Sequence, residues 1–249
     1  MSLNLILGNM FSGKTSELIR RYNRYSIGNK KCLMIKYKND TRYDPFMIVT
    51  HDNIKIKAIV CEFLYEADII ISNYDVICID EVQFYKDANI FCDKWANQGK
   101  TVEACGLNGT FNRTQFPIIS NLIPLAENIT FLKAICKESG EEATFTQLNT
   151  DTDGLNKETN ELIGGSDKYG AVDRKTYLAK MGEPDYLNQF LNFYAELNGL
   201  KNVSLIGYVK EQLGELNREN LKMIGDSALA YYNSLNDHES ASESKSENE

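Results

Sequence analysis

The first half of the chain alternates short apolar runs with stretches in which apolar residues recur at helical spacing. Short apolar runs bounded by glycine or polar positions predict buried strands. The expected strands cover residues 3–7, 31–37, 76–80, 101–107 and 129–136. The expected helices cover residues 16–25, 62–72 and 87–98, with Gly28 and Gly99 at the ends of the first and last. Strands that alternate with helices predict an α/β fold, in which helices cover both faces of a largely parallel sheet.

The pattern changes near Cys136. Residues 137–160 are polar, rich in turn-forming residues and without helical periodicity. Such a stretch predicts a long loop in a small second lobe. We therefore expect a first domain over residues 1–134 and the small lobe over residues 135–178.

Apolar residues return at helical spacing between residues 186 and 224. This spacing predicts a helical extension over residues 179–235, whose role the sequence does not reveal. The final segment, residues 236–249, contains five acidic residues, one lysine and no apolar anchor. Such a composition predicts a disordered acidic tail.

The composition limits the kind of protein. A chain of 249 residues, 43% of them hydrophobic, can bury one substantial core, and no apolar stretch is long enough to span a bilayer. The net charge of −8 argues against a grip on nucleic acid. The six cysteines lie mostly in apolar runs, and no N-terminal stretch has the pattern of a signal peptide. We expect a cytoplasmic protein with reduced thiols that binds neither nucleic acid nor membranes.

The most informative motif is GNMFSGKT, which matches the phosphate-binding pattern G-x-x-x-x-G-K-[ST] at every fixed position. Backbone amides of such a loop surround phosphate oxygens, Lys14 supplies a cation, and the Thr15 hydroxyl can ligate Mg²⁺. The motif follows an expected strand and precedes an expected helix, which disfavours the alternative of a glycine-rich turn with a surface lysine. The expected nucleotide-binding residues of this loop are Gly8, Asn9, Met10, Phe11, Ser12, Gly13, Lys14 and Thr15.

A second acidic element follows the strand that ends near Asp80. Because the carboxyl ends of parallel strands meet at one edge of a sheet, we expect Asp80 to face Thr15 across a bound Mg²⁺, partly through water. The next residue, Glu81, would lie beside the γ-phosphate. A carboxylate there accepts the proton of an attacking hydroxyl in a kinase, or orients water in a hydrolase. The residues alone leave both roles open.

Five segments make the chain similar to the cytosolic (type II) thymidine kinase family. In chain order they are GNMFSGKT, KYKNDTRY, IDEVQFY, LNGTFNRTQF and IGGSDKY. The resemblance implies a P-loop domain similar to the RecA-like core, a small lobe whose lasso-like loop encloses the nucleoside, and a homotetramer. It also implies that the γ-phosphate of ATP passes to the 5′-hydroxyl of thymidine, with deoxyuridine as a further candidate acceptor.

The resemblance assigns roles to several residues. Glu81 would be the general base that draws the proton from the 5′-hydroxyl. Asp40 and Arg42 match family positions near the triphosphate, where Arg42 suits developing negative charge and Asp40 would bind metal waters or orient Arg42. Gln83 lies in the same phosphate-side segment as Asp80. Without the family, Asp40 and Arg42 would be interpreted as part of a solvated loop.

By the same resemblance, flat apolar side chains are expected to hold the pyrimidine. In this family backbone groups of the lasso largely read the base edge, so no particular polar side chain is needed there. Without the family, each of these aromatic residues would be interpreted as core. The expected acceptor residues are Met10, Phe84, Leu107, Phe111, Phe116 and Thr146 from the side of the main domain, and Asn160, Glu161, Leu162, Ile163, Gly164 and Tyr169 from the lasso.

The chain departs from the family where many members bind zinc through two C-x-x-C pairs. The corresponding segments are CKES, from Cys136 to Ser139, and DRKT, from Asp173 to Thr176. One thiolate, one carboxylate and two hydroxyls make a poor zinc site. We therefore expect no structural zinc, and a small lobe held by packing and hydrogen bonds. Asn108 also stands where the family commonly has Asp, a change that can alter nucleoside affinity.

Two other functions remain to be weighed. A kinase that has lost catalysis would hold nucleotide and act as a scaffold through its C-terminal extension, but the intact Lys14, Thr15, Asp80 and Glu81 argue against it. A P-loop ATPase that couples hydrolysis to movement leaves the lasso motif unexplained, and the chain has no strongly basic or arginine-rich bridging segment. Phosphate transfer from ATP to a panel of nucleosides separates the three functions.

Overall fold

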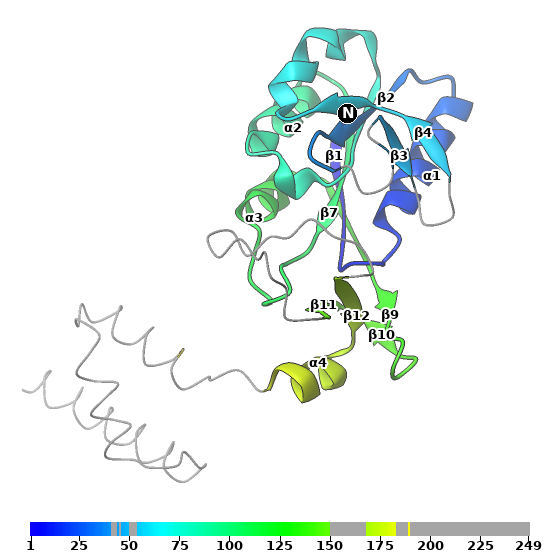
Figure 1. The fold of residues 1–249 in the computed structure, drawn as a ribbon. Coiled ribbons are helices and arrows are strands. Elements are labelled where there is room, and N and C mark those ends of the chain that lie inside the picture. The colour runs from blue at the N-terminus through cyan, green and yellow to red at the C-terminus, as the bar shows by residue number, and fades with distance from the viewer. Residues whose placement is uncertain (41–43, 45, 50–53, 150–167, 183–188, 190–249) are drawn as a thin grey trace, which may run out of the picture. The chain divides into compact units, whose positions relative to one another are not determined.

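In the part of the chain that the structure describes, six strands form the central sheet, in the order β5–β2–β6–β7–β1–β8. Figure 1 shows β1, β2 and β7 of these strands, with α1, α2 and α3 around the sheet. The computed structural model describes residues 1–40, 44, 46–49, 54–149, 168–182 and 189. The strands of the sheet are β1 (Ser2–Gly8), β2 (Cys32–Tyr37), β5 (Ile59–Cys61), β6 (Val76–Ile79), β7 (Thr101–Leu107) and β8 (Asn128–Leu132). All neighbouring strands run parallel, which confirms the predicted α/β fold.

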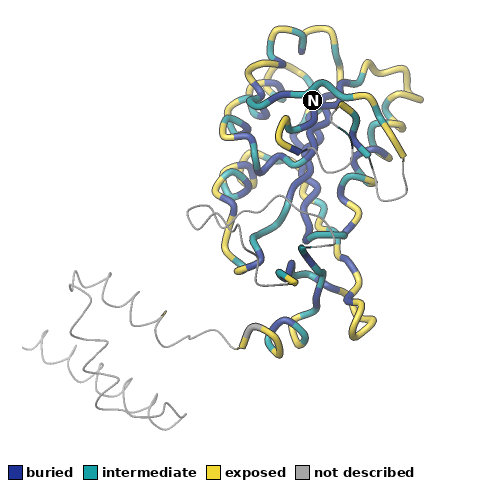
Figure 2. Tube along the Cα trace, viewed as in Figure 1, coloured by how far each residue is buried: buried dark blue, intermediate teal, exposed yellow. Residues whose placement is uncertain are grey.

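Helices cover both faces of this sheet. They are α1 (Lys14–Ile27), η1 (Leu64–Asn73), η2 (Val82–Phe84), α2 (Ala88–Asn97), α3 (Pro117–Leu122) and η3 (Ile123–Leu125). Successive residues of β1 point to opposite faces: Ile6 packs with Leu18 of α1, whereas Leu5 packs with residues of η1, α2 and α3. Burial on both faces explains why the strands are continuous apolar runs (Figure 2). No helix among the described residues is long and apolar enough to cross a membrane.

Two predicted elements differ in detail from the structure. The helix expected over residues 62–72 is the 3₁₀ helix η1, in which Leu64 N and Tyr65 N donate to the carboxylate of Asp87 at 3.1 and 3.0 Å. Consecutive isoleucines in this segment disfavour the α conformation. The strand expected over residues 129–136 is interrupted at Lys133, because the chain leaves the central sheet there and enters the small lobe.

Several short strands escaped the sequence analysis. They are β3 (Met47–Val49), β4 (Lys55–Lys57), β5, β10 (Glu142–Ala143), β11 (Phe145–Leu148) and β12 (Tyr169–Val172), whereas β9 (Ala134–Ile135) is the end of the strand predicted over residues 129–136. The small lobe combines the antiparallel pairs β9–β10 and β11–β12 with the helix α4 (Arg174–Met181). Elements of two to four residues are too short to show a period.

The main domain and the small lobe both belong to one unit, Met1–Gly182. Apart from Gln189, the expected helical extension and acidic tail lie outside the described residues. The domain boundaries drawn from the sequence at residues 134, 178 and 235 therefore stay predictions.

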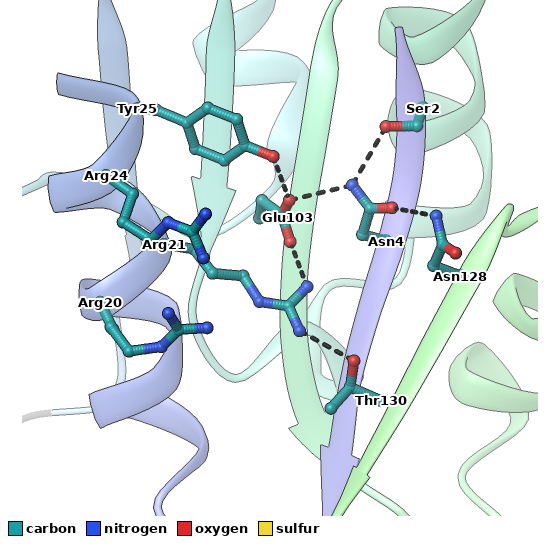
Figure 3. Close-up of a pocket in the computed structure, with 9 residues that line it drawn as sticks. All are labelled: Ser2, Asn4, Arg20, Arg21, Arg24, Tyr25, Glu103, Asn128 and Thr130. Carbon is teal, nitrogen blue, oxygen red and sulfur yellow. Dashed lines mark hydrogen bonds and ion pairs between the residues drawn. The ribbon is translucent and has the colours of Figure 1, made fainter. Parts of the chain in front are cut away.

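A buried carboxylate on β7, Glu103, fastens α1 to the sheet (Figure 3). Glu103 is 2% exposed and accepts hydrogen bonds from Arg21 Nη1 at 2.8 Å, Tyr25 Oη at 2.8 Å and Asn4 Nδ2 at 2.9 Å. Arg21 also donates to Thr130 of β8 at 2.8 Å. Burial and the contact with Glu103 raise the pKa of Tyr25 to about 12, so its hydroxyl stays a donor. The cluster holds α1, which begins within residues 8–15, the segment with the phosphate-binding pattern that we call the phosphate loop.

The same cluster lines a hollow of about 580 Å³, which also includes Arg20, Arg24 and Asn128 (Figure 3). It lies toward the amino ends of β1 and β8, because Ser2 and Asn4 of β1 form part of its wall. The phosphate loop follows the opposite end of β1. The hollow and the predicted nucleotide site are therefore at different ends of the sheet.

We expect Glu103→Ala to lower the free energy of unfolding by about 3 kcal/mol, because it leaves buried donors and a largely buried arginine without their shared carboxylate. Urea denaturation measures the change. The control is Glu142→Ala, which removes an exposed carboxylate paired with Lys133 and should cost less than about 0.5 kcal/mol. Equal losses in the two variants would contradict the anchoring role of Glu103.

Candidate active site

The phosphate loop connects the end of β1 to the start of α1. A Cβ atom at Gly8 would lie 2.4 Å from the carbonyl oxygen of Leu132, so this position requires glycine. Gly13 has φ 80° and Phe11 has φ 65°, both in the left-handed region. Gly13 is also the N-cap of α1 and provides no side chain to cap it. The first amides of α1 are therefore suited to an anion.

The loop also contacts the small lobe. Lys14 is 9% exposed, and its Nζ donates to the carbonyl oxygen of Asn9 at 2.7 Å. Asn9 Nδ2 donates to the carbonyl oxygen of Phe145 at 3.2 Å, and Met10 N donates to Thr146 Oγ1 at 3.1 Å. These two bonds place the loop against β11, which carries the predicted acceptor residue Thr146.

Thr15 and Asp80 lie together, although 65 residues separate them in sequence. Thr15 Oγ1 donates to Asp80 Oδ1 at 3.2 Å. The Cys105 thiol also lies 2.8 Å from Asp80 Oδ1, and burial raises the pKa of this thiol well above its usual value, so it is a donor. A hydroxyl and a carboxylate are oxygen ligands that Mg²⁺ prefers. The residues at this point fit the predicted metal.

Glu81 follows Asp80 in an unusual backbone conformation. Its φ of 53° and ψ of 48° are left-handed, a conformation that costs a non-glycine residue on the order of 1 kcal/mol and occurs often at functional sites. Gln83 Nε2 donates to Glu81 Oε2 at 2.7 Å, and Gln83 Oε1 accepts from Leu107 N at 3.2 Å. The structure thus places Gln83 against the predicted base, a contact that the sequence did not reveal.

Asp40 is buried rather than part of a solvated loop. It is 4% exposed, and its Oδ2 lies 3.6 Å from Lys36 Nζ. Lys36 is a buried cation of β2 that the sequence analysis missed, because one lysine in an apolar run is usually a residue at the edge of a strand. The predicted partner Arg42 lies outside the described residues.

Two pairs of aromatic rings contain predicted acceptor residues. Phe111 and Tyr169 are 8% and 7% exposed, with ring centroids 6.4 Å apart. Phe84 stacks on Tyr37 with centroids 5.2 Å apart. The first pair joins a loop of the main domain to β12 of the small lobe. This is the arrangement expected of residues that close a pocket between two lobes.

The other predicted acceptor residues have more varied surroundings. Phe116 lies in the main core, where Leu107 packs against the same cluster. Thr146 lines a hollow of about 270 Å³ together with residues 108–110, 113–115, 144 and 145. Residues 160–164, expected to read the base, lie outside the described residues.

The four positions that replace the two C-x-x-C pairs come together in the small lobe. Asp173 Oδ1 caps α4 by accepting from Thr176 N at 2.8 Å, and Asp173 Oδ2 accepts from Thr176 Oγ1 at 3.1 Å and from Ser139 Oγ. Cys136 Sγ lies 3.7 Å from Thr176 Oγ1. Burial acts to raise the pKa of the Cys136 thiol, but hydrogen bonds with Ser139, the backbone of Asp173 and Thr176 lower it to about 7. The hydrogen bond from Ser139 also lowers the pKa of Asp173.

The same helix contacts the segment between β7 and α3, which carries the predicted acceptor residue Phe111 and which we call the acceptor loop. Tyr177 Oη donates to the carbonyl oxygen of Phe111 at 2.9 Å, and the Arg113 guanidinium lies 4.8 Å from the Tyr177 ring centroid. The sequence does not reveal this link, because an aromatic residue at the start of a helix is usually a core residue. In the described residues no cluster of three or more His, Cys, Asp or Glu side chains could hold a metal ion.

A glycine-containing loop between a buried parallel strand and a helix, together with an acidic residue at the carboxyl end of another strand of the same sheet, defines the class of P-loop α/β proteins. Within this class, the sequence comparisons are more specific. The family model described as thymidine kinase matches residues 1–177. The chain belongs to the thymidine kinase family.

Individual relatives agree with the family match. Thymidine kinase 1 of Dictyostelium discoideum is 45% identical over 185 residues, which cover 73% of this chain and 79% of the relative. The thymidine kinase of rabbit fibroma virus is 45% identical over 175 residues, 70% of this chain and 95% of the relative. The cytosolic thymidine kinase of Bos taurus is 43% identical over 187 residues, 75% of this chain and 76% of the relative.

We expect the protein to keep its fold when zinc is removed, because Cys136, Ser139, Asp173 and Thr176 hold each other through hydrogen bonds. Incubation with a strong zinc chelator should leave the melting temperature within about 1 °C of its starting value. Elemental analysis of the purified protein should find far less than one zinc per chain. Stoichiometric zinc, together with a large loss of melting temperature on chelation, would contradict this expectation.

Proposed function

We propose that the protein transfers the γ-phosphate of ATP to the 5′-hydroxyl of thymidine to give thymidine monophosphate, with deoxyuridine as a second acceptor. Membership of the thymidine kinase family and the names of three relatives support this activity. The observation that carries the proposal is the contact of Thr15 with Asp80 directly beside Glu81. The reaction would serve nucleotide salvage for DNA synthesis.

In the proposed reaction the phosphate loop positions ATP. The amides of residues 8–15 bind the β- and γ-phosphates, and the Lys14 ammonium neutralises part of their charge. Thr15 and Asp80 would hold Mg²⁺, which when bound withdraws charge from the phosphates. Arg42 would stabilise the charge of the transferred group, and Asp40 would orient it.

Glu81 is the proposed general base. Its carboxylate accepts the proton of the 5′-hydroxyl while the hydroxyl oxygen forms a bond to the γ-phosphorus. The bond from the γ-phosphorus to the bridging oxygen breaks at the same time, and ADP leaves with that electron pair. The left-handed backbone of Glu81 supports this role, because strain of this kind is common at functional sites.

The nucleoside is proposed to lie against Met10, Phe84, Phe111 and Tyr169. The Phe111–Tyr169 ring pair and the bond from Met10 N to Thr146 support this placement. Leu107 and Phe116 would close the pocket from the core side. The proposed base-reading residues are Asn160, Glu161, Leu162, Ile163 and Gly164.

We propose a cytoplasmic homotetramer with ATP and nucleosides as its ligands and without nucleic acid or membrane partners. All six cysteines are free in the structure, and the bovine relative is named as cytosolic. The net charge of −8 is unfavourable for binding polyanions. Sedimentation analysis of the purified protein tests the tetramer.

The test of the activity is incubation with labelled ATP, Mg²⁺ and a panel of nucleosides. Labelled thymidine monophosphate supports the proposal. Release of labelled phosphate that does not depend on nucleoside would identify an ATPase. Nucleotide binding without any turnover would identify a scaffold.

We expect Glu81→Gln to lower kcat by about 10²- to 10⁴-fold, because the amide cannot accept the hydroxyl proton. The KM values for ATP and thymidine should change little, since the substitution keeps the shape of the side chain. The control is Glu62→Gln, which alters an exposed carboxylate paired with Lys38 and should keep the original rate. Transfer by Glu81→Gln at the original rate would remove Glu81 from its assigned role.

A further inference from the structure

The end of β7 lies against the segment that follows β6: Cys105 contacts Asp80 directly, and Leu107 N donates to Gln83, which in turn contacts Glu81. β6 and β7 are neighbouring parallel strands, and Ile79 pairs with Ala104. The chain of β7 therefore continues beside the segment that begins at Asp80. A rigid strand lies against the residues proposed to carry the chemistry.

The contact with Glu81 passes through Gln83. The Gln83 side chain is 5% exposed and held at both ends: its Oε1 accepts from Leu107 N at 3.2 Å, and its Nε2 donates to Glu81 Oε2 at 2.7 Å. A Cβ atom at Gly106 would lie 2.7 Å from Gln83 Oε1, so this glycine leaves room for the amide. A main-chain amide of β7 thus fixes which end of the Gln83 side chain faces Glu81.

The contact with Asp80 is direct. Cys105 Sγ lies 2.8 Å from Asp80 Oδ1, the same oxygen that accepts from Thr15 Oγ1 at 3.2 Å. Cys105 is 1% exposed and otherwise packs among apolar residues of the α1 face, including Ile6 and Leu18. Alanine or valine would fill such a place equally well if packing were its only role. The carboxylate gives the thiol a polar partner that packing alone does not require.

We propose that Gln83 and Cys105 are positioning residues, which use the end of β7 to orient Glu81 and Asp80 respectively. Neither residue needs to touch a substrate. Each donates a hydrogen bond that removes rotational freedom from a carboxylate, and catalytic groups must be held within about 0.5 Å of their working geometry. The inference rests on the proposed roles of Glu81 and Asp80. The tests below distinguish a failure of the positioning roles from a failure of the proposed kinase activity.

The test for Gln83 is a double-mutant cycle with Glu81. In the wild-type background, Gln83→Met removes the donor at similar size and should lower kcat by roughly 10- to 100-fold, with KM values for ATP and thymidine within about threefold. In the Glu81→Gln background, the same change should cost less than about threefold, because the group that Gln83 orients is already inactive. Gln83→Leu serves if the methionine variant does not fold, and the exposed Gln98→Met is the control.

Several outcomes would overturn the role of Gln83. If the loss of kcat in the double variant equals the product of the losses in the two single variants, Gln83 acts independently of Glu81. A rise in the KM for ATP without a fall in kcat would show that it binds phosphate instead. A wild-type protein that transfers no phosphate to thymidine refutes the proposed function itself, and the Cys105 test below does not depend on transfer.

The test for Cys105 is nucleotide binding, followed with a fluorescent ATP analogue while Mg²⁺ is titrated. Cys105→Ala should raise the half-saturating Mg²⁺ concentration by roughly five- to tenfold, the effect of losing one hydrogen bond from a weak donor such as a thiol. Cys105→Ser keeps a donor and should return the value to within about twofold of wild type. The control is Cys92→Ala, which removes a buried thiol from α2, where it packs in the other core cluster.

Three results would refute the role of Cys105. The first is that Cys105→Ala shows the same Mg²⁺ dependence as Cys92→Ala. The second is that Cys105→Ser folds normally by circular dichroism but does not restore the wild-type Mg²⁺ dependence. The third is that Mg²⁺ has no effect on nucleotide binding by the wild type. The last result would also remove the proposed metal role of Asp80. If Cys105→Ala changes the Mg²⁺ dependence of nucleotide binding but the wild-type protein transfers no phosphate to thymidine, the positioning role of Cys105 stands and only the kinase activity is refuted.

Discussion

The register of three parallel strands is the constraint on which the site depends. Gly8 at the end of β1 pairs with Leu107 at the end of β7, and Ile79 at the end of β6 pairs with Ala104 of β7. The phosphate loop, the two acidic residues and the acceptor loop therefore start at one edge of the sheet. Because parallel strands need helical crossovers, residues far apart in sequence meet there. The Thr15–Asp80 hydrogen bond is the direct result.

The sequence alone predicted the strands and the glycine-rich loop that this register brings together. The runs that became β1, β2, β6 and β7 were visible because both faces of a parallel sheet are buried, and the loop GNMFSGKT was visible because it matches the phosphate-binding pattern at every fixed position and lies between a strand and a helix. Contacts that depend on side-chain direction were not predictable. Nothing in TVEACGL shows that Glu103 fastens α1 or that Cys105 meets Asp80, and nothing in IDEVQFY shows that Gln83 turns back onto Glu81.

The small lobe shows a different way to meet a structural need. At the two positions where the family resemblance implies cysteine pairs, the side chains of Cys136, Ser139, Asp173 and Thr176 gather around the start of α4, and Asp173 caps that helix. Tyr177, in the same helix, donates a hydrogen bond to the carbonyl oxygen of Phe111 in the acceptor loop. Hydrogen bonds thus connect the end of the family-matched region to the proposed nucleoside pocket. The sequence predicted the loss of the metal ligands, whereas the network that takes their place required the fold.

In the proposed reaction the edge of the sheet presents Glu81 to a hydroxyl beside a bound triphosphate. The most direct measurement is a crystal structure of the protein with ADP, Mg²⁺, aluminium fluoride and thymidine, which together imitate the transfer. We expect a carboxylate oxygen of Glu81 within about 3.2 Å of the thymidine 5′-oxygen, with the fluoride group against Lys14. A structure in which Glu81 points away from the nucleoside, and another group contacts the 5′-oxygen, would contradict it.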